Sequence, residues 1–315
     1  MTGAQVVLGA MNYGTTVDER RAVELLDTFV EHGGTWIDTA DCYSFWNDPS
    51  GVGGASEHVL GSWLAARPGA PVKISTKVRH QPLVPHRWPE SAEGLSAGAI
   101  RQGVAGSLER LGVESVDLLW AHAEDRTVAL EETVATFGEL VKDGTVRAVG
   151  ASNHAAWRVA QARDLAAGLG VEPWSAVQLR YSYVLPRPGR QLPGDGHMHA
   201  SQEQLDQAVV EGLTVWAYSP LINGAYVRAD RPLPEIYDHP GTAQRLEVLA
   251  EVAKEADATA KPGGAGLADG RYTADLADPR GEHRRPARGR PCRARPRPRR
   301  PAAGPPRRAC LGWPA

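Results

Sequence analysis

The sequence predicts an α/β protein built as a (β/α)8 TIM barrel over residues 1–260. Seven short apolar segments occur in a row, and six of them are clearly followed by an amphipathic helical segment. The apolar segments begin about every 30 to 45 residues, which is the size of one strand–helix unit. Most are apolar at successive positions, a pattern typical of strands buried on both faces of a parallel sheet.

Seven segments have the composition of buried strands: residues 5–10, 35–40, 72–78, 116–122, 146–152, 175–181 and 213–219. A doubly wound sheet is the alternative architecture, but its first strand usually leads into a GxGxxG turn. The segment LGAMNYGTT contains no such turn. The glycines of GVGGAS follow no strand directly, and we interpret them as a loop before a helix capped by Ser56.

Helical patterns fill the intervals between the strands: residues 18–34, 56–66, 97–112, 130–144, 154–170 and 201–212. Four of these segments end in a glycine, and we expect these glycines to terminate the helices: Gly112, Gly144, Gly170 and Gly212.

The composition is that of an ordinary soluble globular protein, with 42% hydrophobic and 23% charged residues. The formal net charge of −2 gives no reason to expect nucleic acid as a partner. No apolar run approaches the roughly 20 residues of a membrane helix, and the N-terminus lacks the pattern of a secretory signal. The three cysteines show no CxxC spacing. We therefore expect a cytoplasmic protein without a membrane partner, and the sequence predicts no oligomeric state.

Residues 261–315 differ from the rest of the chain. They are rich in Pro, Arg, Ala and Gly and show neither helix nor strand periodicity. Such a segment cannot bury enough apolar surface to offset its chain entropy, so we expect a tail of low order and no regular eighth strand.

Ionisable side chains stand near the ends of the predicted strands. Asp38 ends the second strand, Tyr43 follows five residues later, Lys77 ends the third strand and His122 ends the fourth. In a parallel barrel the carboxyl ends of all strands meet at one mouth, where active sites lie. Each residue alone has an ordinary structural explanation, but four in strand order at one mouth indicate a catalytic site.

The chain resembles the aldo-keto reductase family over residues 5–258. The segments that carry the resemblance are GGTWIDTADCY, GGASEHVLGSWL, VKISTKV, SLERLGVESVDLLWAH, LVKDGTVRAVGASN, VQLRYS and VWAYSPL. The resemblance implies that Asp38, Tyr43, Lys77 and His122 are the catalytic tetrad of a carbonyl reductase, which acts on a small-molecule carbonyl compound.

Elementary chemistry fits these roles. A phenol has an ordinary pKa near 10, and a nearby ammonium is expected to lower it. Lys77, held by Asp38, would thus make Tyr43 a better acid, and His122 would orient the substrate carbonyl.

The resemblance also implies NADPH as the cofactor. The positions that match its binding residues are Ser152, Asn153, Gln178, Tyr218, Ser219, Leu221 and Gly224. Four aromatic residues in loops are candidates for the wall of the substrate pocket: Tyr13, Phe45, Trp46 and Trp88. Packing of the long loops on themselves is an equal alternative for these four. Cys42 precedes Tyr43, and we expect it to point the other way and to serve in packing.

Family members continue with an eighth strand and a helix that binds the adenosine end of the cofactor, but this chain departs from the pattern after residue 260. Codons chosen among synonyms for KPGGAGLADG, read one base later, encode NQVVLAWLT, which resembles the expected continuation. A frameshift near residue 260 is therefore our hypothesis. Two further alternatives are a non-enzymatic cofactor-binding subunit like the channel-associated β subunits, and an inactive truncated product.

Overall fold

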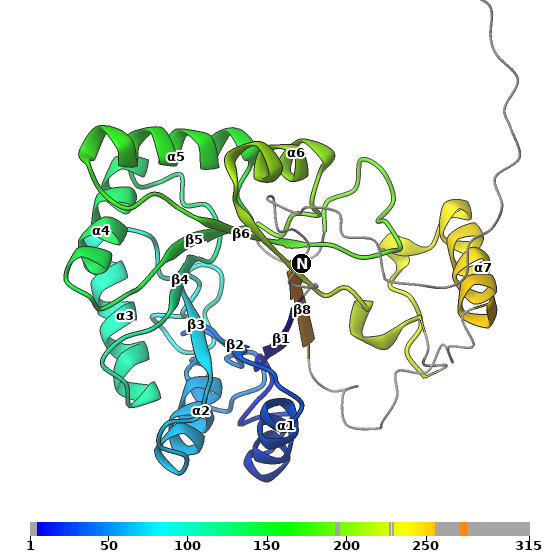
Figure 1. Cartoon of the computed structure of the whole chain (residues 1–315), viewed down its shortest axis with the longest axis horizontal. Helices are drawn as coiled ribbons and strands as arrows, with labels where there is room; N and C mark the ends of the chain where they lie inside the picture. The colour runs from blue at the N-terminus through cyan, green and yellow to red at the C-terminus, as the bar shows by residue number, and fades with distance from the viewer. Residues whose placement is uncertain (1–4, 193–195, 227, 229, 256–270, 276–315) are drawn as a thin grey trace, which may run out of the picture. The chain divides into compact units, whose positions relative to one another are not determined.

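Seven parallel strands follow one another around a barrel in chain order in a computed structural model of the protein (Figure 1). The strands are β1 (Val6–Gly9), β2 (Trp36–Asp38), β3 (Lys73–Val78), β4 (Leu118–Ala121), β5 (Val149–Ser152), β6 (Ala176–Arg180) and β7 (Thr214–Tyr218). The structure describes residues 5–192, 196–226, 228, 230–255 and 271–275. All of them belong to one of the chain's two compact units, Thr2–Gly281. The predicted barrel and all seven predicted strands are confirmed, with slightly shorter ends.

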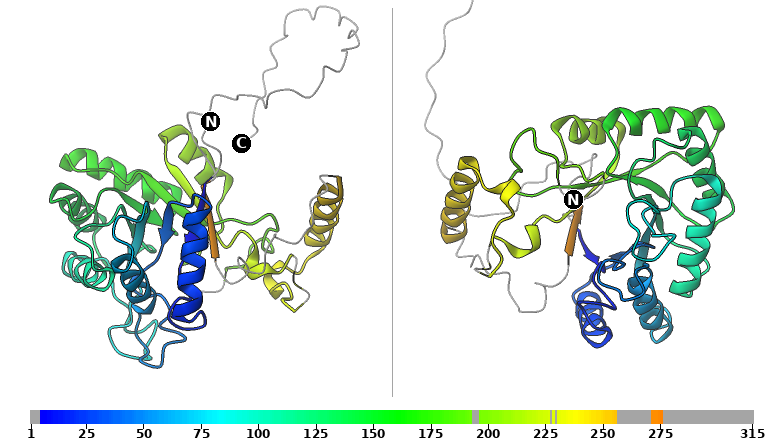
Figure 2. Two further views of the ribbon diagram at one scale, coloured as in Figure 1. Left: turned by 60° about the horizontal axis from the view of Figure 1, so that its bottom comes forward. Right: turned by 180° about the vertical axis from the view of Figure 1, so that it is seen from behind.

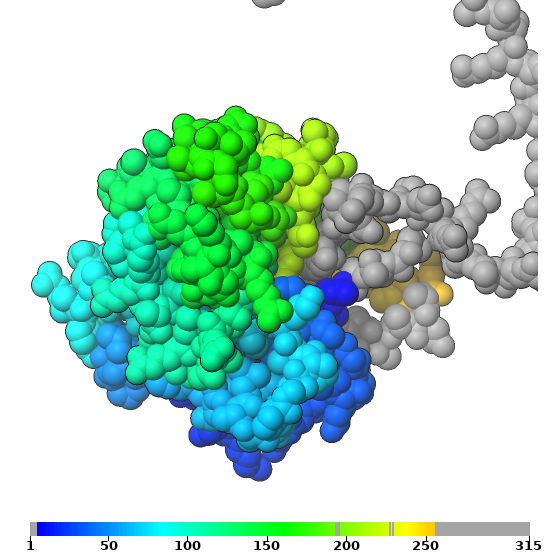
Figure 3. Space-filling view, turned by 60° about the vertical axis from the view of Figure 1, so that its left-hand side comes forward, coloured from blue at the N-terminus to red at the C-terminus, as the bar shows by residue number. Residues whose placement is uncertain are grey.

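The helices that follow the strands lie on the outside of the barrel (Figure 2). They are α1 (Glu19–Glu31), α2 (Ala55–Ala65), α3 (Ala97–Leu111), α4 (Leu130–Lys142), α5 (Ala156–Leu169), α6 (Gln202–Glu211) and α7 (Pro240–Glu255), with the short 3-10 helices η1 (Ile222–Gly224) and η2 (Glu235–Tyr237). Helices α2 to α5 pack against their neighbours and form a continuous outer surface (Figure 3). No described helix is both long and apolar enough to cross a membrane.

Most of the predicted helix ends are confirmed. Gly112, Gly170 and Gly212 each end a helix in the left-handed conformation, which glycine adopts without strain. Helix α4 ends one residue earlier than predicted, at a cap formed by Asp143, and its glycine follows.

The predicted cap of α2 is wrong. Gly54 takes the N-cap position, and Ser56 lies inside the first turn. The Ser56 hydroxyl donates to the backbone oxygen of Ala10 at 2.8 Å and hydrogen bonds to Thr39 at 2.8 Å. Ser56 therefore connects α2 to the residues that follow β1 and β2, instead of capping the helix.

Among the described residues, the strand that closes the barrel is antiparallel, which agrees with the expectation that a regular parallel eighth strand is missing. Residues Arg271–Asp275 form β8, which pairs antiparallel with both β1 and β7. Position 271 of this strand stands opposite Gly9, the last residue of β1. An antiparallel strand presents its amino end to the barrel mouth, so it does not supply the strand ending that a parallel eighth strand would place there. The rest of the predicted low-order tail, residues 261–270 and 276–315, lies outside the described residues.

Tryptophans fill the amino-terminal half of the barrel interior. Trp120 and Trp36 both contact Trp216 edge to face, with ring centroids 5.2 Å apart in each pair. A cavity of about 240 Å³ borders this cluster at the amino ends of the strands. This half of the barrel is therefore apolar. The opposite, carboxyl end is where active sites of such barrels lie.

Candidate active site

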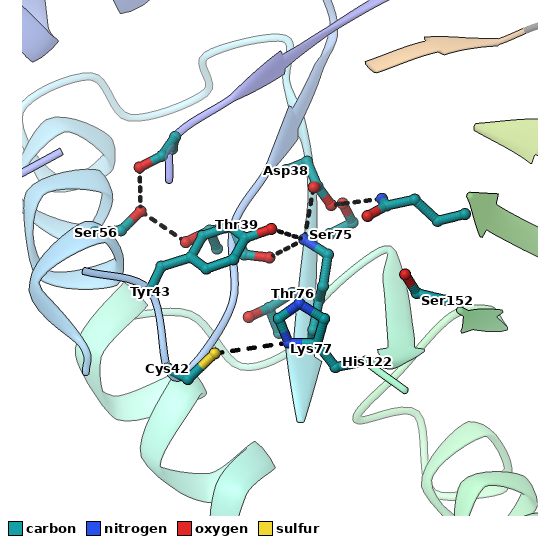
Figure 4. Close-up of polar contacts among 12 residues, drawn as sticks. Asp38, Thr39, Cys42, Tyr43, Ser56, Ser75, Thr76, Lys77, His122 and Ser152 are labelled. Atoms are coloured by element: carbon teal, nitrogen blue, oxygen red, sulfur yellow. Dashed lines mark hydrogen bonds and ion pairs between the residues drawn. The ribbon is translucent and has the colours of Figure 1, made fainter. Parts of the chain in front are cut away.

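The four predicted catalytic residues converge at the carboxyl end of the barrel (Figure 4). Lys77, on β3, is fully buried, and its ammonium lies 2.6 Å from Oδ2 of Asp38 at the end of β2. The same ammonium lies 2.8 Å from the hydroxyl oxygen of Tyr43. His122 directly follows β4, and its ring centroid is 5.7 Å from that of Tyr43. The structure thus brings together all four residues.

The ammonium of Lys77 has a partner for each of its three N–H groups. It donates to Asp38, to the backbone oxygen of Thr39 at 2.7 Å and to Tyr43. The Tyr43 oxygen accepts from the ammonium, which has only donors, so the hydroxyl proton of Tyr43 is left to point elsewhere. This arrangement leaves a phenol able to donate a proton to a bound molecule.

Residues on neighbouring strands hold Asp38 in place. Ser75 stands opposite Asp38 in the β2–β3 ladder, and its hydroxyl donates to Oδ1 at 2.6 Å. Gln178 on β6 donates to the same oxygen at 3.3 Å. Sequence reasoning missed Ser75, although it precedes Lys77 by two residues, and residues two apart on a strand face the same side.

Burial dominates the acidity of Tyr43. It raises the pKa of Tyr43 to about 12, because the loss of solvent around the phenolate outweighs the attraction of the Lys77 ammonium. Lys77 does lower this pKa, as expected from the sequence, but the net shift has the opposite direction. Burial also opposes the charge of Lys77, yet the carboxylate of Asp38 and the hydroxyl of Tyr43 raise its pKa above the ordinary value. The ammonium is therefore charged at neutral pH.

His122 is a neutral imidazole in this site. Its pKa is well below the ordinary value, first because it is buried and then because His80 and Lys77 would repel its positive form. His80 follows β3, and its ring centroid is 5.1 Å from that of His122. His197, from the long segment between β6 and α6, adds to the repulsion. Sequence reasoning missed both histidines, although His80 lies three residues after Lys77.

Cys42 contacts His122, which corrects the predicted orientation. The expectation that Cys42 and Tyr43 point in opposite directions assumed an extended chain, but residues 41–47 form consecutive turns. The Cys42 sulfur consequently lies 3.6 Å from Nδ1 of His122 while Tyr43 reaches Lys77. The thiol is buried, as predicted, and burial raises its pKa well above the ordinary value.

A buried group of acidic side chains supports the turn that carries Tyr43. Asp41 faces Glu93, and the pKa of Asp41 is well above its usual range because of burial and of this second carboxyl. Glu57 on α2 accepts from Thr76 at 2.6 Å and from Arg110 on α3 at 2.7 Å. Asp41, Glu57 and Arg110 all lie in segments that carry the family resemblance, which was the available signal for their importance. Asp41, Cys42 and His122 also present three possible metal ligands within 4.8 Å of one another.

The predicted residues for the nicotinamide amide lie together beside the tetrad. The Asn153 side chain donates to the backbone oxygen of His122 and to the hydroxyl of Ser152, both at 3.1 Å. Its oxygen accepts from the hydroxyl of Tyr218 at 2.8 Å. All three residues are buried: Ser152 ends β5 and pairs in register with Gln178 on β6, and Asn153 directly follows β5.

The segment after β7 contains Ser219, Leu221 and Gly224, the residues that the family resemblance assigned to cofactor binding. Ser219 is buried, and among the described residues nothing hydrogen bonds to its hydroxyl. The backbone takes positive φ at Ser219 and again at 222–224. Within this turn the N–H groups of Ile222 and Gly224 donate to the backbone oxygens of Ser219 and Leu221. Gly224 belongs to this turn with a φ of 86°, and Leu221 is 37% exposed beside it.

Three of the four predicted pocket aromatics form a connected wall next to Tyr43. The ring centroid of Trp46 lies 6.4 Å from that of Tyr43 and 5.0 Å from that of Phe45. Phe45 is 5.5 Å from Trp88 between ring centroids, and Trp88 is 6.1 Å from His80. The fourth aromatic, Tyr13, is buried within the main core cluster. The wall therefore runs from the general-acid candidate to the histidines.

Comparison with known proteins identifies relatives with redox functions. The uncharacterized oxidoreductase YrpG of Bacillus subtilis is 31% identical over 223 residues, or 70% of this chain and 64% of the relative. Norsolorinic acid reductase A of Aspergillus parasiticus is 31% identical over 56% of this chain and 46% of its own length. Human aflatoxin B1 aldehyde reductase member 4 is 31% identical over 69% of this chain and 58% of its own length.

The matched part of the chain spans about half to two thirds of the length of these curated relatives. The family model described as "Aldo/keto reductase family" matches residues 5–262, which is most of the chain and includes every residue of the site. The chain therefore belongs to the aldo/keto reductase family.

Proposed function

We propose that this protein reduces an aldehyde or a ketone to an alcohol, with a hydride from NADPH and with Tyr43 as the general acid. One observation carries the proposal: the buried Lys77 ammonium donates to the oxygen of Tyr43, so the phenol proton is directed away from Lys77. A carbonyl oxygen placed beside Tyr43 would accept that proton as the carbon receives a hydride.

Each of the four tetrad residues has a separate role in the proposed reaction. When bound, the nicotinamide supplies the hydride. Tyr43 donates its proton to the carbonyl oxygen, and Lys77 stabilises the phenolate that remains. Asp38 keeps Lys77 charged and in place. The imidazole of His122 is neutral, so it offers one N–H as a second donor to the oxygen as its negative charge develops.

NADPH is the cofactor that we assign to this site. Ser152, Asn153 and Gln178 present amide and hydroxyl groups to a carboxamide, which needs both donors and acceptors. The turn that begins at Ser219 supports a pyrophosphate there through one feature: the Ser219 hydroxyl is buried and has no hydrogen-bond partner among the described residues. The preference for NADPH over NADH rests on the family resemblance.

The substrate that we propose carries an aromatic or bulky apolar group. The wall formed by Phe45, Trp46 and Trp88 offers apolar faces close to Tyr43, and Trp46 is 45% exposed. The names of the relatives, which include an aldehyde reductase and norsolorinic acid reductases, agree with a carbonyl substrate. We place the enzyme in the cytoplasm, with a small molecule as its partner.

A carbonyl-substrate screen with the Tyr43→Phe variant tests the proposal. The unchanged protein should oxidise NADPH only when a carbonyl compound is present. Tyr43→Phe removes the proton donor and should lower kcat by about 10²- to 10⁴-fold while NADPH still quenches protein fluorescence. Tyr183→Phe, at a tyrosine that is 38% exposed and lies outside the site, is the matched control.

Near-normal turnover in Tyr43→Phe would contradict the assignment of the acid. NADPH binding without turnover in the unchanged protein would favour the alternative of a cofactor-binding subunit. An insoluble product that binds no cofactor would favour a damaged chain.

A further inference from the structure

Asp41, Cys42 and His122 form a cluster of three different metal-ligand types. One ligand atom from each residue lies within 4.8 Å of the other two. The cluster extends from the buried turn after β2 to the half-buried histidine that follows β4, and Figure 4 shows the contact between Cys42 and His122. Only His122 of the three takes part in the proposed reduction, so the cluster has chemistry that the mechanism does not use.

The distance between Cys42 and His122 matches the edge of a zinc site. Zinc binds thiolate sulfur at about 2.3 Å and imidazole nitrogen at about 2.1 Å, and a tetrahedral angle then places the two ligand atoms about 3.6 Å apart. The observed distance from Sγ of Cys42 to Nδ1 of His122 is 3.6 Å. These two side chains therefore need almost no movement to hold the ion.

The carboxyl group of Asp41 lacks a donor of its own. It is 1% exposed, and among the described residues no N–H or O–H group donates to either of its oxygens. Its neighbour Glu93 is itself a carboxyl, so the two can hydrogen bond only by sharing a proton. A buried carboxylate without a donor is unfavourable, so Asp41 must bind either a proton or a cation. A divalent cation bound to one Asp41 oxygen would take the place of the proton.

We propose that Asp41, Cys42 and His122 bind a thiophilic divalent cation, Zn²⁺ or Cd²⁺, with one oxygen, one sulfur and one nitrogen ligand. Binding releases the thiol proton of Cys42 and any proton on Asp41 to solvent, and no group is oxidised or reduced. A fourth position is left for water. Because the ion takes Nδ1, His122 keeps its proton on Nε2, and the site can be filled without removing that donor.

Metal titration of the full chain with the other two cysteines replaced tests the proposal. In the Cys292→Ser, Cys310→Ser background Cys42 is the one thiol of the chain, which contains three cysteines. One equivalent of Cd²⁺ should produce a thiolate-to-metal absorption band, and Zn²⁺ should abolish it by displacement. These readouts need no turnover, so they stand whether or not the protein is a reductase.

Three variants separate the proposed site from adventitious binding. Cys42→Ser should lose the band, and His122→Gln and Asp41→Asn should each weaken Cd²⁺ affinity by at least about 10-fold. His58→Gln, at an exposed histidine of α2, is the matched control and should leave affinity unchanged. If Cys42→Ser does not fold, the two remaining ligand variants still decide the question. Absence of the absorption band at one equivalent of Cd²⁺ would overturn the proposal. So would a Cd²⁺ affinity of His122→Gln and Asp41→Asn equal to that of the protein with all three ligands.

Discussion

At the scale of single residues, the site depends on one buried ammonium. Removing Lys77 from water is costly, and the fold compensates with one carboxylate, one backbone oxygen and one phenol. Because all three N–H groups are engaged, Lys77 has no free donor for a substrate. It therefore acts on the reaction through the charge state and orientation of Tyr43.

The pH profile of the reduction should reflect the raised pKa of Tyr43. Tyr43 must be protonated to act as an acid, and its pKa of about 12 means that protonation persists far above neutral pH. His122 must be neutral, and its lowered pKa keeps it neutral below pH 6.5. We expect kcat/KM for carbonyl reduction to stay within about twofold between pH 6 and pH 9.

A different profile would support the expectation from the sequence. If kcat/KM in the free enzyme falls with a midpoint near pH 8, Lys77 lowers the pKa of Tyr43 more than burial raises it. Lys77→Met then separates the two effects, because it removes the ammonium and should move such a midpoint upward.

Residue identities at the site could be predicted from the sequence better than their electrostatics. The tetrad was found because residue type, order and position after each strand are all visible in the chain. The direction of the Tyr43 pKa shift was not, because it depends on how completely the site excludes water. The contact between Cys42 and His122 was missed because it needs the turns at 41–47, which a pattern of alternation does not represent.

At the scale of secondary-structure elements, α2 and α3 meet at a glycine. A Cβ atom added to Gly61 of α2 would lie 2.2 Å from the backbone oxygen of Arg110 on α3. Backbone cannot move aside as a flexible side chain does. The close approach also brings Arg110 to Glu57, whose carboxylate it contacts at 2.7 Å.

Gly61→Ala should therefore destabilise the protein. Forcing the two helices apart should lower the free energy of unfolding by about 1–3 kcal/mol, as measured by urea denaturation. Gly98→Ala on α3 is the matched control, because a Cβ there meets nothing within 4 Å. That change should be neutral or should stabilise by up to about 1 kcal/mol. Equal destabilisation by both substitutions would show that the contact between Gly61 and Arg110 does not determine the effect.

The parallel strands and their helices could be predicted because their hydrophobic pattern is local. Continuous apolar runs separated by helix-period segments and glycine stops define six of the seven strand–helix units without reference to the rest of the chain. Strand β8 could not, because its pairing with β1 and β7 is a property of the closed barrel and its sequence, RYTAD, has no apolar run. Its pairing partners β1 and β7 follow from the closure of the barrel, which a local sequence pattern does not represent.

At the scale of the whole molecule, the strand that closes the barrel runs antiparallel to the other seven strands. Seven strands run parallel, and β8 runs against both of its neighbours. Of the residues in α7, only Thr242 is buried, whereas Val248 and Val252 are 45% and 53% exposed. A helix that follows β7 in a complete barrel would cover the sheet with its apolar side. The last elements in chain order, α7 and β8, are thus the least regular part of the barrel.

The family match ends shortly after α7 and before β8. The family model stops at residue 262, and our frameshift hypothesis places the change of reading frame near residue 260. We propose that the segment from 261 onward is read in a shifted frame. The synonymous codons chosen for residues 261–270, read one base later, encode VVLAWLT, a continuous apolar run that suits a parallel strand buried between β7 and β1.

Sequencing the DNA across codon 260 tests this proposal, and a frame-corrected chain tests its consequence. The corrected chain should have a higher melting temperature, because a parallel eighth strand and its helix would bury apolar surface that α7 now exposes. It should also bind NADPH more tightly, since the restored segment is where the family holds the adenosine end. If the next frame has no family-like continuation, or if the corrected chain melts no higher, the antiparallel β8 is the genuine closure of this barrel.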